Sequence, residues 1–360
     1  MEKLSTRAKA LYAQELSNLV DLRAAGKKTA AFVCSTFPPA VLAGLGLRPV
    51  RLPLIITTDR EKNEKSLVRQ DVCPLVMELL ESIQTDCADV AIGMHTCDTT
   101  RRFFQESGRF SSIPVHQLQL PAVIGSASLK FFTSQVHRLC DDLVLNGISD
   151  GYNPEIAEEW YKNTIEAAEF VRSIMMNIPP LALQYVLHLF RISDPSSIME
   201  KLKKLLRDSV EYQPKFTLLL SGGPISPGDD TVAEIVEEMG GALIPVNCTG
   251  FQMFPEGKPA DYSPASISKM YFDSMKCVRC RPNDKTFDHL SDEVSSTSAH
   301  GLIMKSLVFC DLWFTEKVRV KERISVPVLV LNTGFSPGES ERTAVRVEAF
   351  VQSLEVDNHE

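Results

Sequence analysis

The chain has 360 residues, of which 44% are hydrophobic and 23% charged, a composition typical of folded globular proteins that excludes disordered and collagen-like chains. Its 38 Lys and Arg residues are outnumbered by 46 Asp and Glu residues, and the net charge of −8 argues against general nucleic-acid binding, which needs a basic face. The length predicts two domains. The longest apolar runs are too short to span a membrane, and the charged N-terminal segment has no apolar signal-peptide core, so we expect a cytoplasmic protein without membrane contact.

Short apolar runs alternate with helical patterns in the first third of the chain. Strands are expected at 29–33, 49–53, 89–93 and 113–118, and the segment Phe37-Pro38-Pro39 opens a short helix that runs to Leu45. Strands separated by helical stretches are typical of βαβ units. The first third therefore predicts a mainly parallel sheet.

The middle of the chain is helical. Asn153 before Pro154 predicts an N-cap followed by a first-turn proline. Positions 156, 160, 167, 171 and 174 then form one apolar face, and Pro179-Pro180 is expected to stop the helix. A further helix is expected to start near residues 193–195.

The alternation of strands and helices resumes after Pro214. We expect a helix at 229–239, a final helix with an apolar face at 347, 350, 351 and 354, and strands at 216–220, 242–246, 302–308 and 326–331. The sequence thus predicts an α/β protein with two halves of similar plan. The domains we expect are residues 1–125, a helical segment at 126–212, and residues 213–360.

The chain contains nine cysteines, an odd number that does not suit a disulfide framework in a chain of this size. Ligands of open parallel sheets bind at the carboxyl ends of the strands. Four cysteines follow predicted strands at that edge: Cys34, Cys97, Cys248 and Cys310. This placement favours thiolate ligands of a soft metal centre over scattered core residues.

Of the other cysteines, two have simple structural interpretations and two form a CxxC pair. Cys140 completes a helical apolar stripe and Cys87 precedes a strand, so both are expected to be structural. Cys277 and Cys280 form a CxxC, but no second CxxC or HxxxH completes a zinc site. Ligands donated singly by distant loops predict instead one cluster between the domains, and three thiolates would leave one iron of a [4Fe–4S] cube open to substrate.

Seven segments carry a resemblance to a known superfamily: CSTFPPAVLAGLGLRPVRL (34–52), VCPLVMELL (72–80), HTCDTTRR (95–102), NCTG (247–250), CVRCRPN (277–283), GLIMKSLVFCDLWFTE (301–316) and VPVLVLNTGFSPGESERTAVRVEAFVQSL (326–354). With these motifs the chain resembles the small, D-component-like subunits of the 2-hydroxyacyl-CoA dehydratase and benzoyl-CoA reductase superfamily. That superfamily also contains the double-cubane cluster proteins.

The resemblance implies two Rossmann-like domains with a [4Fe–4S] cluster in the cleft, and it places the three cluster cysteines at Cys34, Cys97 and Cys310. It implies a dimer with a homologous second subunit or with itself. It further implies an ATP-dependent iron–sulfur activator protein that supplies one electron. The expected reaction is the elimination of water from an (R)-2-hydroxyacyl-CoA through a ketyl radical, which makes the acyl-CoA the substrate and the enzyme a hydro-lyase.

Three alternatives stay open. Cys73, Cys248 and Cys280 match positions of the double-cubane branch, in which six thiolates hold an [8Fe–9S] cluster that serves an ATP-dependent reductase of small molecules. A benzoyl-CoA reductase-like subunit is a related alternative. Ala40 stands where many relatives have glutamate, which leaves a role for a carboxylate there in doubt and lends support to a partner subunit without its own chemistry.

The polar residues near the cysteines each have a functional and a structural interpretation. Ser35 is predicted to approach the substrate or the open iron, and the alternative is a helix-capping serine. His95 and the pair Arg101-Arg102 could meet a cluster sulfur and a CoA phosphate, but a lone loop histidine and a solvated pair are the simpler interpretations. The sequence Ser221-Gly222-Gly223 could cradle a phosphate, and ordinary turn chemistry is simpler.

Overall fold

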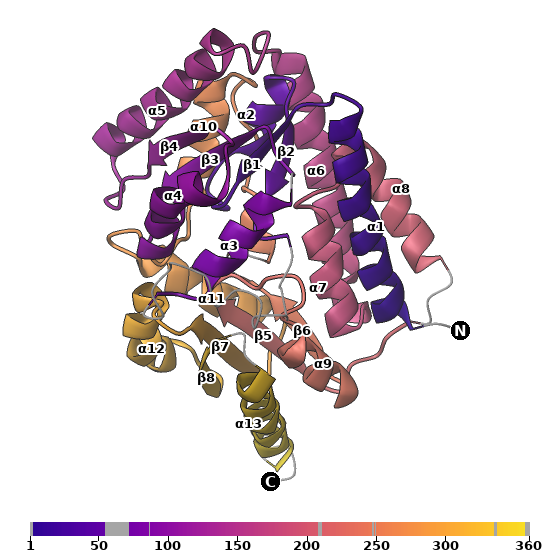
Figure 1. Cartoon of the computed structure of the whole chain (residues 1–360). Helices are drawn as coiled ribbons and strands as arrows, with labels where there is room; N and C mark the ends of the chain where they lie inside the picture. Colours follow the sequence, from indigo (N-terminus) through magenta and orange to yellow (C-terminus); the bar gives the residue numbers. More distant parts are fainter. Residues whose placement is uncertain are drawn as a thin grey trace.

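Two four-stranded, all-parallel sheets form the frame of the molecule (Figure 1). The computed structural model describes residues 3–54, 72–85, 87–207, 211–246, 248, 250–334 and 337–356. The strand orders, β2-β1-β3-β4 and β6-β5-β7-β8, follow the same plan in both halves. The predicted α/β architecture with parallel sheets is therefore confirmed.

The first sheet lies in the upper part of Figure 1 and is accompanied by short helices. Its strands are β1 (Thr29–Phe32), β2 (Arg48–Arg51), β3 (Val90–His95) and β4 (Val115–Gln119). The helices between them are α2 (Pro39–Gly44), α3 (Leu75–Gln84) and α4 (Asp98–Phe110). Every residue of β1, an inner strand, and of β2, an edge strand, is buried. The edge strand is covered, since the backbone N–H of Arg51 donates to the carbonyl of Arg191.

The second sheet lies in the lower part of the same view. Its strands are β5 (Thr217–Gly222), β6 (Ala242–Pro245), β7 (Gly301–Leu307) and β8 (Val328–Thr333). The helices that connect or follow them are α9 (Thr231–Glu238), α10 (Pro264–Asp273), α11 (Asp284–Ser296), α12 (Asp311–Arg323) and α13 (Pro337–Val356). All eight strands predicted from the apolar runs are present, with ends displaced by a few residues.

The helical middle segment contains α5 (Ser126–Leu145), α6 (Pro154–Ile174), α7 (Pro180–Leu189) and α8 (Pro195–Leu206), and α1 (Leu4–Ala24) packs beside it on α7. The predicted cap of α6 is confirmed, since the side chain of Asn153 accepts hydrogen bonds from the backbone N–H groups of Glu155 and Ile156.

The helix that begins at Pro154 ends before Pro179-Pro180, as expected, since α6 stops at Ile174 and only a short 3-10 turn follows to Asn177. Pro180 also begins α7, because a proline fits the first helical turn. One expectation for the middle segment is wrong. Ile156 is 44% exposed, so it does not belong to the packed face of α6; Ala157 and Tyr161 are buried in its place.

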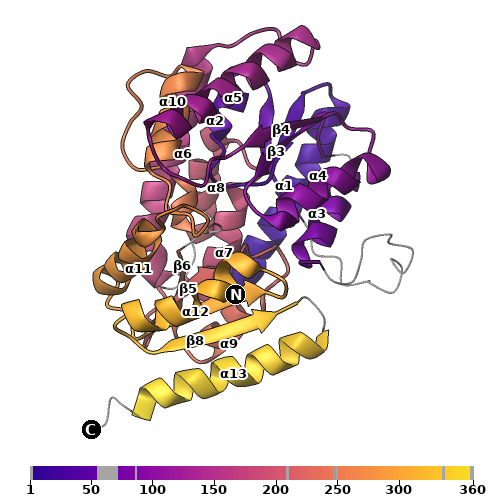
Figure 2. The ribbon, with the colours of Figure 1, turned by 90° about the vertical axis from the view of Figure 1, so that its left-hand side faces the viewer.

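One large core joins the two sheets. Ala31 and Val50 of the first sheet belong to the same cluster of buried side chains as Leu219 and Ile244 of the second. Conversely, α10 of the second half packs on α5 and α2 in the upper part of the molecule, whereas α13 lies along the far edge beside β8 (Figure 2). The domain boundaries expected from the sequence stay a prediction.

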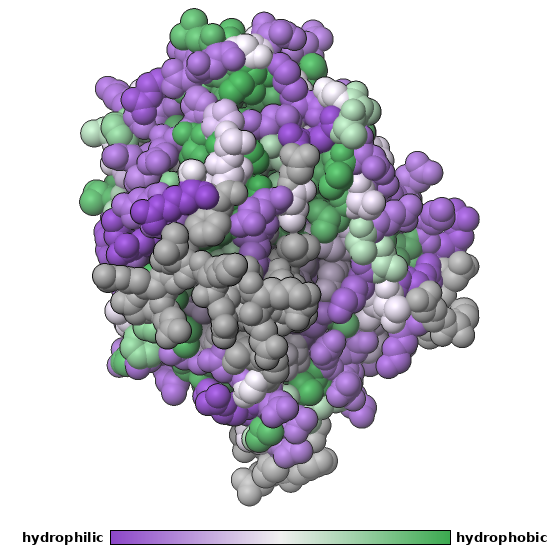
Figure 3. Space-filling model, viewed as in Figure 1, coloured by the Kyte–Doolittle hydropathy of each residue, from purple (hydrophilic) through white to green (hydrophobic). Residues whose placement is uncertain are grey.

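On the face shown in Figure 3, hydrophilic residues cover most of the described surface and hydrophobic residues occur among them in small groups. Within the described part of the chain, none of the helices combines the length and apolarity that crossing a bilayer requires.

Candidate metal centre

Six of the nine cysteines line one cavity, to which both halves of the chain contribute walls. They are Cys34, Cys73, Cys97, Cys248, Cys277 and Cys310, and we call this cavity the thiol chamber. Its atom-free space, counted together with the open mouth, is about 690 Å³. All six thiols are free. The described residues contain no tight group of three His, Cys, Asp or Glu side chains placed to hold a single metal ion, so the thiols are spread around the walls of the chamber.

The first half of the chain supplies three of these thiols from strand ends and helix starts. Cys34 lies two residues beyond the end of β1, and its Sγ is 3.0 Å from the hydroxyl of Thr36. Cys97 is the N-cap of α4, two residues after β3, and shares a capping box with Thr100. Cys73 precedes Pro74, the N-cap of α3.

The second half supplies the other three. Cys310 is the N-cap of α12, three residues after β7. Cys248 lies three residues after β6, and Cys277 lies in the turn that follows α10. Since α3, α4 and α12 all begin next to a chamber thiol, three positive helix ends lie close to the chamber, and such ends favour thiolates and bound anions.

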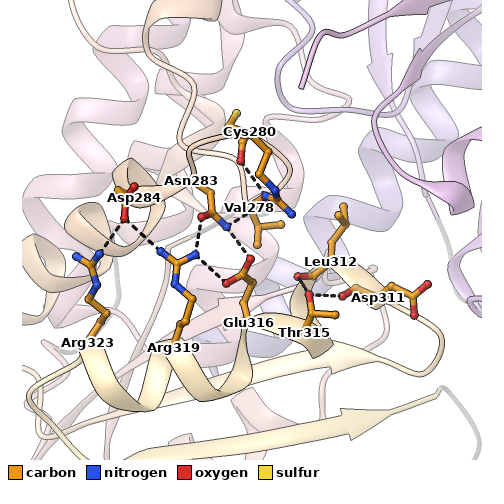
Figure 4. Close-up of polar contacts among 11 residues, drawn as sticks. Val278, Cys280, Asn283, Asp284, Asp311, Leu312, Thr315, Glu316, Arg319 and Arg323 are labelled. Atoms are coloured by element: carbon orange, nitrogen blue, oxygen red, sulfur yellow. Dashed lines mark hydrogen bonds and ion pairs between the residues drawn. The ribbon is translucent and has the colours of Figure 1, made fainter. Parts of the chain in front are cut away.

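A buried polar network ties the CVRC turn to the helix that starts at Cys310 (Figure 4). The amide of Asn283 donates to the Glu316 carboxylate at 2.7 Å and to the carbonyl oxygen of Val278 at 3.3 Å. Arg319 in turn donates to the side-chain oxygen of Asn283 at 2.7 Å. Because Val278 adjoins Cys277 and both Glu316 and Arg319 belong to α12, this network fixes the positions of two chamber thiols relative to each other.

Of the three additional cysteines predicted from the sequence, Cys73 and Cys248 line the chamber. Cys280 does not line the chamber; its side chain is buried in the core that includes α5 and α10. Cys277, three residues earlier, lines the chamber instead. The backbone N–H of Cys280 donates to the carbonyl of Cys277 at 2.9 Å. Cys277 packs against the same core at its edge and also reaches the chamber. Cys140 and Cys87 are buried core residues, as expected.

Ser35 lines the chamber and also a second cavity next to it. It is not the N-cap of α2, because that position is Pro38, whose side chain offers no cap. Sequence reasoning preferred Ser35 to Thr36, yet Thr36 is the hydroxyl that contacts the Cys34 sulfur. In the sequence, the indication for Thr36 was a hydroxyl side chain two residues after the candidate ligand Cys34.

The other polar candidates have structural partners away from the chamber. The Nε2 of His95 lies 2.8 Å from the side-chain oxygen of Gln117, and Arg101 and Arg102 pair with Asp98 on the surface. Gly222 has φ +118° and a Cβ there would lie 1.9 Å from the Lys305 carbonyl oxygen, so the glycine is required by packing. The next helix starts only at Thr231, so the glycine pair opens no helix that could cradle a phosphate.

Burial controls the protonation of the chamber thiols. It raises the pKa of Cys248 to about 11 and that of Cys310 to about 12, and neighbouring thiols add to both effects. Burial also raises the pKa of Cys277 well above its ordinary value. These side chains are therefore neutral thiols near pH 7, and a soft metal ion that binds them must displace their protons.

Sequence reasoning missed Arg51, which also lines the chamber. Its guanidinium donates to the carbonyl oxygen of Val33 at 3.1 Å and to that of Cys248 at 2.5 Å, and it reaches the Met253 sulfur at 3.7 Å. These partners are all uncharged. A set of soft thiol donors beside a buried cation fits a negatively charged metal–sulfide group, which both could hold. The signal in the sequence was an arginine within the short apolar stretch 49–53, which was expected to form a strand.

Three comparisons with known proteins bear on this site. The family model of the 2-hydroxyglutaryl-CoA dehydratase D-component matches residues 34–354. "Putative dehydratase subunit YjiM" of Escherichia coli (strain K12) is 24% identical over 371 aligned residues, which cover 93% of this chain and 94% of that protein. Among solved structures, the SBP FpvC in complex with Ni²⁺ from P. aeruginosa aligns with 92% of this chain and 98% of its own at 13% identity, with a TM-score of 0.23. That score is too low to define a common fold. The family model covers nearly the whole chain, including all six thiols of the chamber, and the chain belongs to the 2-hydroxyglutaryl-CoA dehydratase D-component family.

Proposed function

We propose that this chain is the iron–sulfur subunit of a dehydratase-family redox enzyme and that its thiol chamber holds the cluster. The observation that supports this is the gathering of six free thiols, three from each half of the chain, around one cavity. When bound, such a cluster accepts an electron at low potential and passes it to a substrate. The electron is expected from an ATP-dependent iron–sulfur activator protein, and the subunit pairs with a homologous chain or with itself.

The geometry favours the six-thiolate, double-cubane form of this function, an ATP-dependent reductase of small molecules. Cys73, Cys248 and Cys277 line the same walls as Cys34, Cys97 and Cys310, so the chamber offers twice the ligands that a single site-differentiated cube needs. The chain's own residues would hold an [8Fe–9S] group between the two halves. Leu75, Leu307 and Trp313 add apolar side chains to the walls.

The second candidate is a 2-hydroxyacyl-CoA dehydratase with one [4Fe–4S] cluster on Cys34, Cys97 and Cys310. Its support is the family itself and the relative named as a dehydratase subunit. In this form Cys34, Cys97 and Cys310 would hold the cluster at the chamber, and the cluster would supply the electron for the loss of water from an acyl-CoA. Ser35, on the wall shared with the neighbouring cavity, would approach the substrate.

Iron counting on anaerobically purified full-length protein tests the proposal and separates the two forms. The double-cubane form predicts about eight irons per chain and the dehydratase form about four. Cys73→Ser and Cys277→Ser should lose iron only in the first case, whereas Cys97→Ser and Cys310→Ser should lose it in both. Cys280→Ser and Cys140→Ser are the matched controls, since neither side chain lines the chamber.

Each result has a definite consequence. A chain that carries no iron alone or with its partner subunit would refute the proposal and favour a partner subunit without its own chemistry. Full iron in Cys97→Ser would refute the ligand assignment. Ser35→Ala should keep its iron and lose substrate-dependent changes in the cluster's spectrum; unaltered spectral changes would remove Ser35 from the site.

A further inference from the structure

Two arginines lie deep in the molecule behind the thiol chamber. Arg51 of β2 is 5% exposed and Arg191, just after α7, is 3% exposed. Both line a second cavity that adjoins the chamber, and Arg51 lines the chamber as well. The two residues are also connected through the backbone, since the N–H of Arg51 donates to the carbonyl of Arg191 at 2.8 Å.

The hydrogen-bond partners of both guanidiniums are uncharged. Arg51 contacts two carbonyl oxygens and a thioether, and Arg191 donates to the carbonyl of Ile225 at 2.9 Å and, at 3.5 Å, to that of Pro53. The Nε of Arg191 is buried and has no partner among the described residues. Neither arginine forms an ion pair with a described carboxylate, although a buried charge is costly unless it is paired.

Arg48, in the same strand as Arg51, is a buried arginine that does have a carboxylate partner. It is 6% exposed and forms an ion pair with Asp194 at 2.5 Å. The environment of the other two arginines shows the effect of missing such a pair: burial and the nearby Arg51 lower the pKa of Arg191 to about 9. The interior behind the chamber therefore carries excess positive charge within the described part of the chain.

We infer that Arg51, supported by Arg191, is the countercharge of an anionic group held in the thiol chamber and sets how easily that group accepts an electron. This inference rests on the proposed function and adds to it a residue that controls the cluster. A thiolate-bound iron–sulfur group becomes more negative by one charge when the activator's electron arrives, and no bond changes. A fixed cation at the chamber wall stabilises that reduced form more than the oxidised form. Arg51 thus raises the reduction potential of the group.

The hydrogen bonds of Arg51 give it a second, positional effect. Its guanidinium joins the carbonyl of Val33, the neighbour of Cys34, to the carbonyl of Cys248 in the other half of the chain. One side chain therefore carries the charge and holds two candidate ligands across the chamber. A test has to separate these two effects.

The experiment compares full-length variants purified anaerobically and titrated with titanium(III) citrate while the cluster spectrum is followed. Arg51→Met, which removes the charge, should lower the midpoint potential by at least about 59 mV, a tenfold loss in the one-electron reduction equilibrium. Arg51→Lys keeps the charge and should shift the potential less than Arg51→Met. Arg48→Met is the matched control from the same strand and should leave the potential unchanged, because Arg48 does not line the chamber.

Several outcomes would overturn the inference. An unchanged potential in iron-loaded Arg51→Met would do so, and equal shifts in the Met and Lys variants would show a positional effect without a charge effect. If Arg51→Met fails to fold, Arg191→Met replaces it and should shift the potential in the same direction by a smaller amount; no shift would overturn the inference. Wild-type protein without iron would instead refute the proposed function itself, so the two failures are distinguishable.

Discussion

Gly250 is the position at which a single methyl group should displace a chamber thiol. The chain returns against the end of β6 there, and a Cβ on Gly250 would lie 1.8 Å from the carbonyl oxygen of Pro245. Real Cβ contacts are essentially never shorter than 3.0 Å, so the two backbone segments must separate by at least the difference, about 1.2 Å. Both contacting groups belong to the backbone, and no side-chain rotation can relieve the overlap.

The expected cost of Gly250→Ala follows from that displacement. Overpacking of this kind destabilises by about 1–3 kcal/mol. Cys248 lies two residues before Gly250, and its carbonyl oxygen accepts the 2.5 Å hydrogen bond of Arg51. If the backbone around Cys248 takes up the shift, that bond lengthens beyond hydrogen-bonding distance, and the loss of a charged hydrogen bond adds about 1.5–3 kcal/mol.

Guanidinium denaturation of metal-free full-length protein measures the loss, and iron content after anaerobic purification measures the effect on the chamber. Gly108→Ala is the matched control, because Gly108 lies in α4 and nothing lies within 4 Å of the added Cβ. That variant should be about 0.5–1 kcal/mol more stable than wild type. A Gly250→Ala protein with wild-type stability and full iron would refute the steric reasoning.

Three other predictions test the fold and its titrating groups. Burial, with Arg191 and Arg51 nearby, holds the pKa of His188 well below its usual range. Below about pH 6.5 the unfolded chain therefore binds a proton that the folded chain excludes. The free energy of unfolding should decrease as the pH is lowered, by up to about 1.4 kcal/mol per pH unit. The loss of unfolding free energy between pH 7.5 and pH 5.5, measured by denaturation, should be smaller in His188→Leu than in wild type. An identical loss in both proteins would contradict the role given to His188. Asn153→Ala should lose about 1 kcal/mol in the same denaturation assay because the N-cap of α6 disappears, and wild-type stability would contradict the cap. Burial raises the pKa of Cys140 to about 12, so iodoacetamide at pH 8 should leave it unmodified in native protein by mass spectrometry, and rapid labelling would show that this core is open.

The sheet edge was predictable from the sequence because parallel strands impose it. Apolar runs predict the eight strands, and a cysteine just beyond such a run must lie at the carboxyl end of its sheet. Cys34, Cys97, Cys248 and Cys310 were placed by this argument, and all four line the thiol chamber. The rule works because strand direction and side-chain position are both fixed by backbone geometry.

The rest of the site depends on tertiary packing that local sequence does not encode. Cys277 and Cys280 stand in the same turn and both pack against the core around α5 and α10, but only the folded chain shows that Cys280 is enclosed there while Cys277 also reaches the chamber. Arg51 looks like an ordinary strand residue until the structure shows a cavity at its guanidinium. Pro180 is compatible with both the end and the start of a helix, and the packing of α7 on α1 selects the start.

The chamber is held in place by packing that does not depend on a bound metal. Its walls come from two sheets, but buried side chains of both sheets belong to one core, and Arg51 bonds the first half to Cys248 in the second. The Asn283 network likewise fixes the Cys277 turn to the helix that begins at Cys310. Preformed ligand positions of this kind reduce the ordering cost of binding a cluster. The uncompensated charge of Arg51 opposes this stability in the metal-free chain, because the cation stays buried with only neutral partners. The same residue therefore makes the empty chamber less stable and a chamber that holds an anion more stable, which favours retention of the group once it is bound.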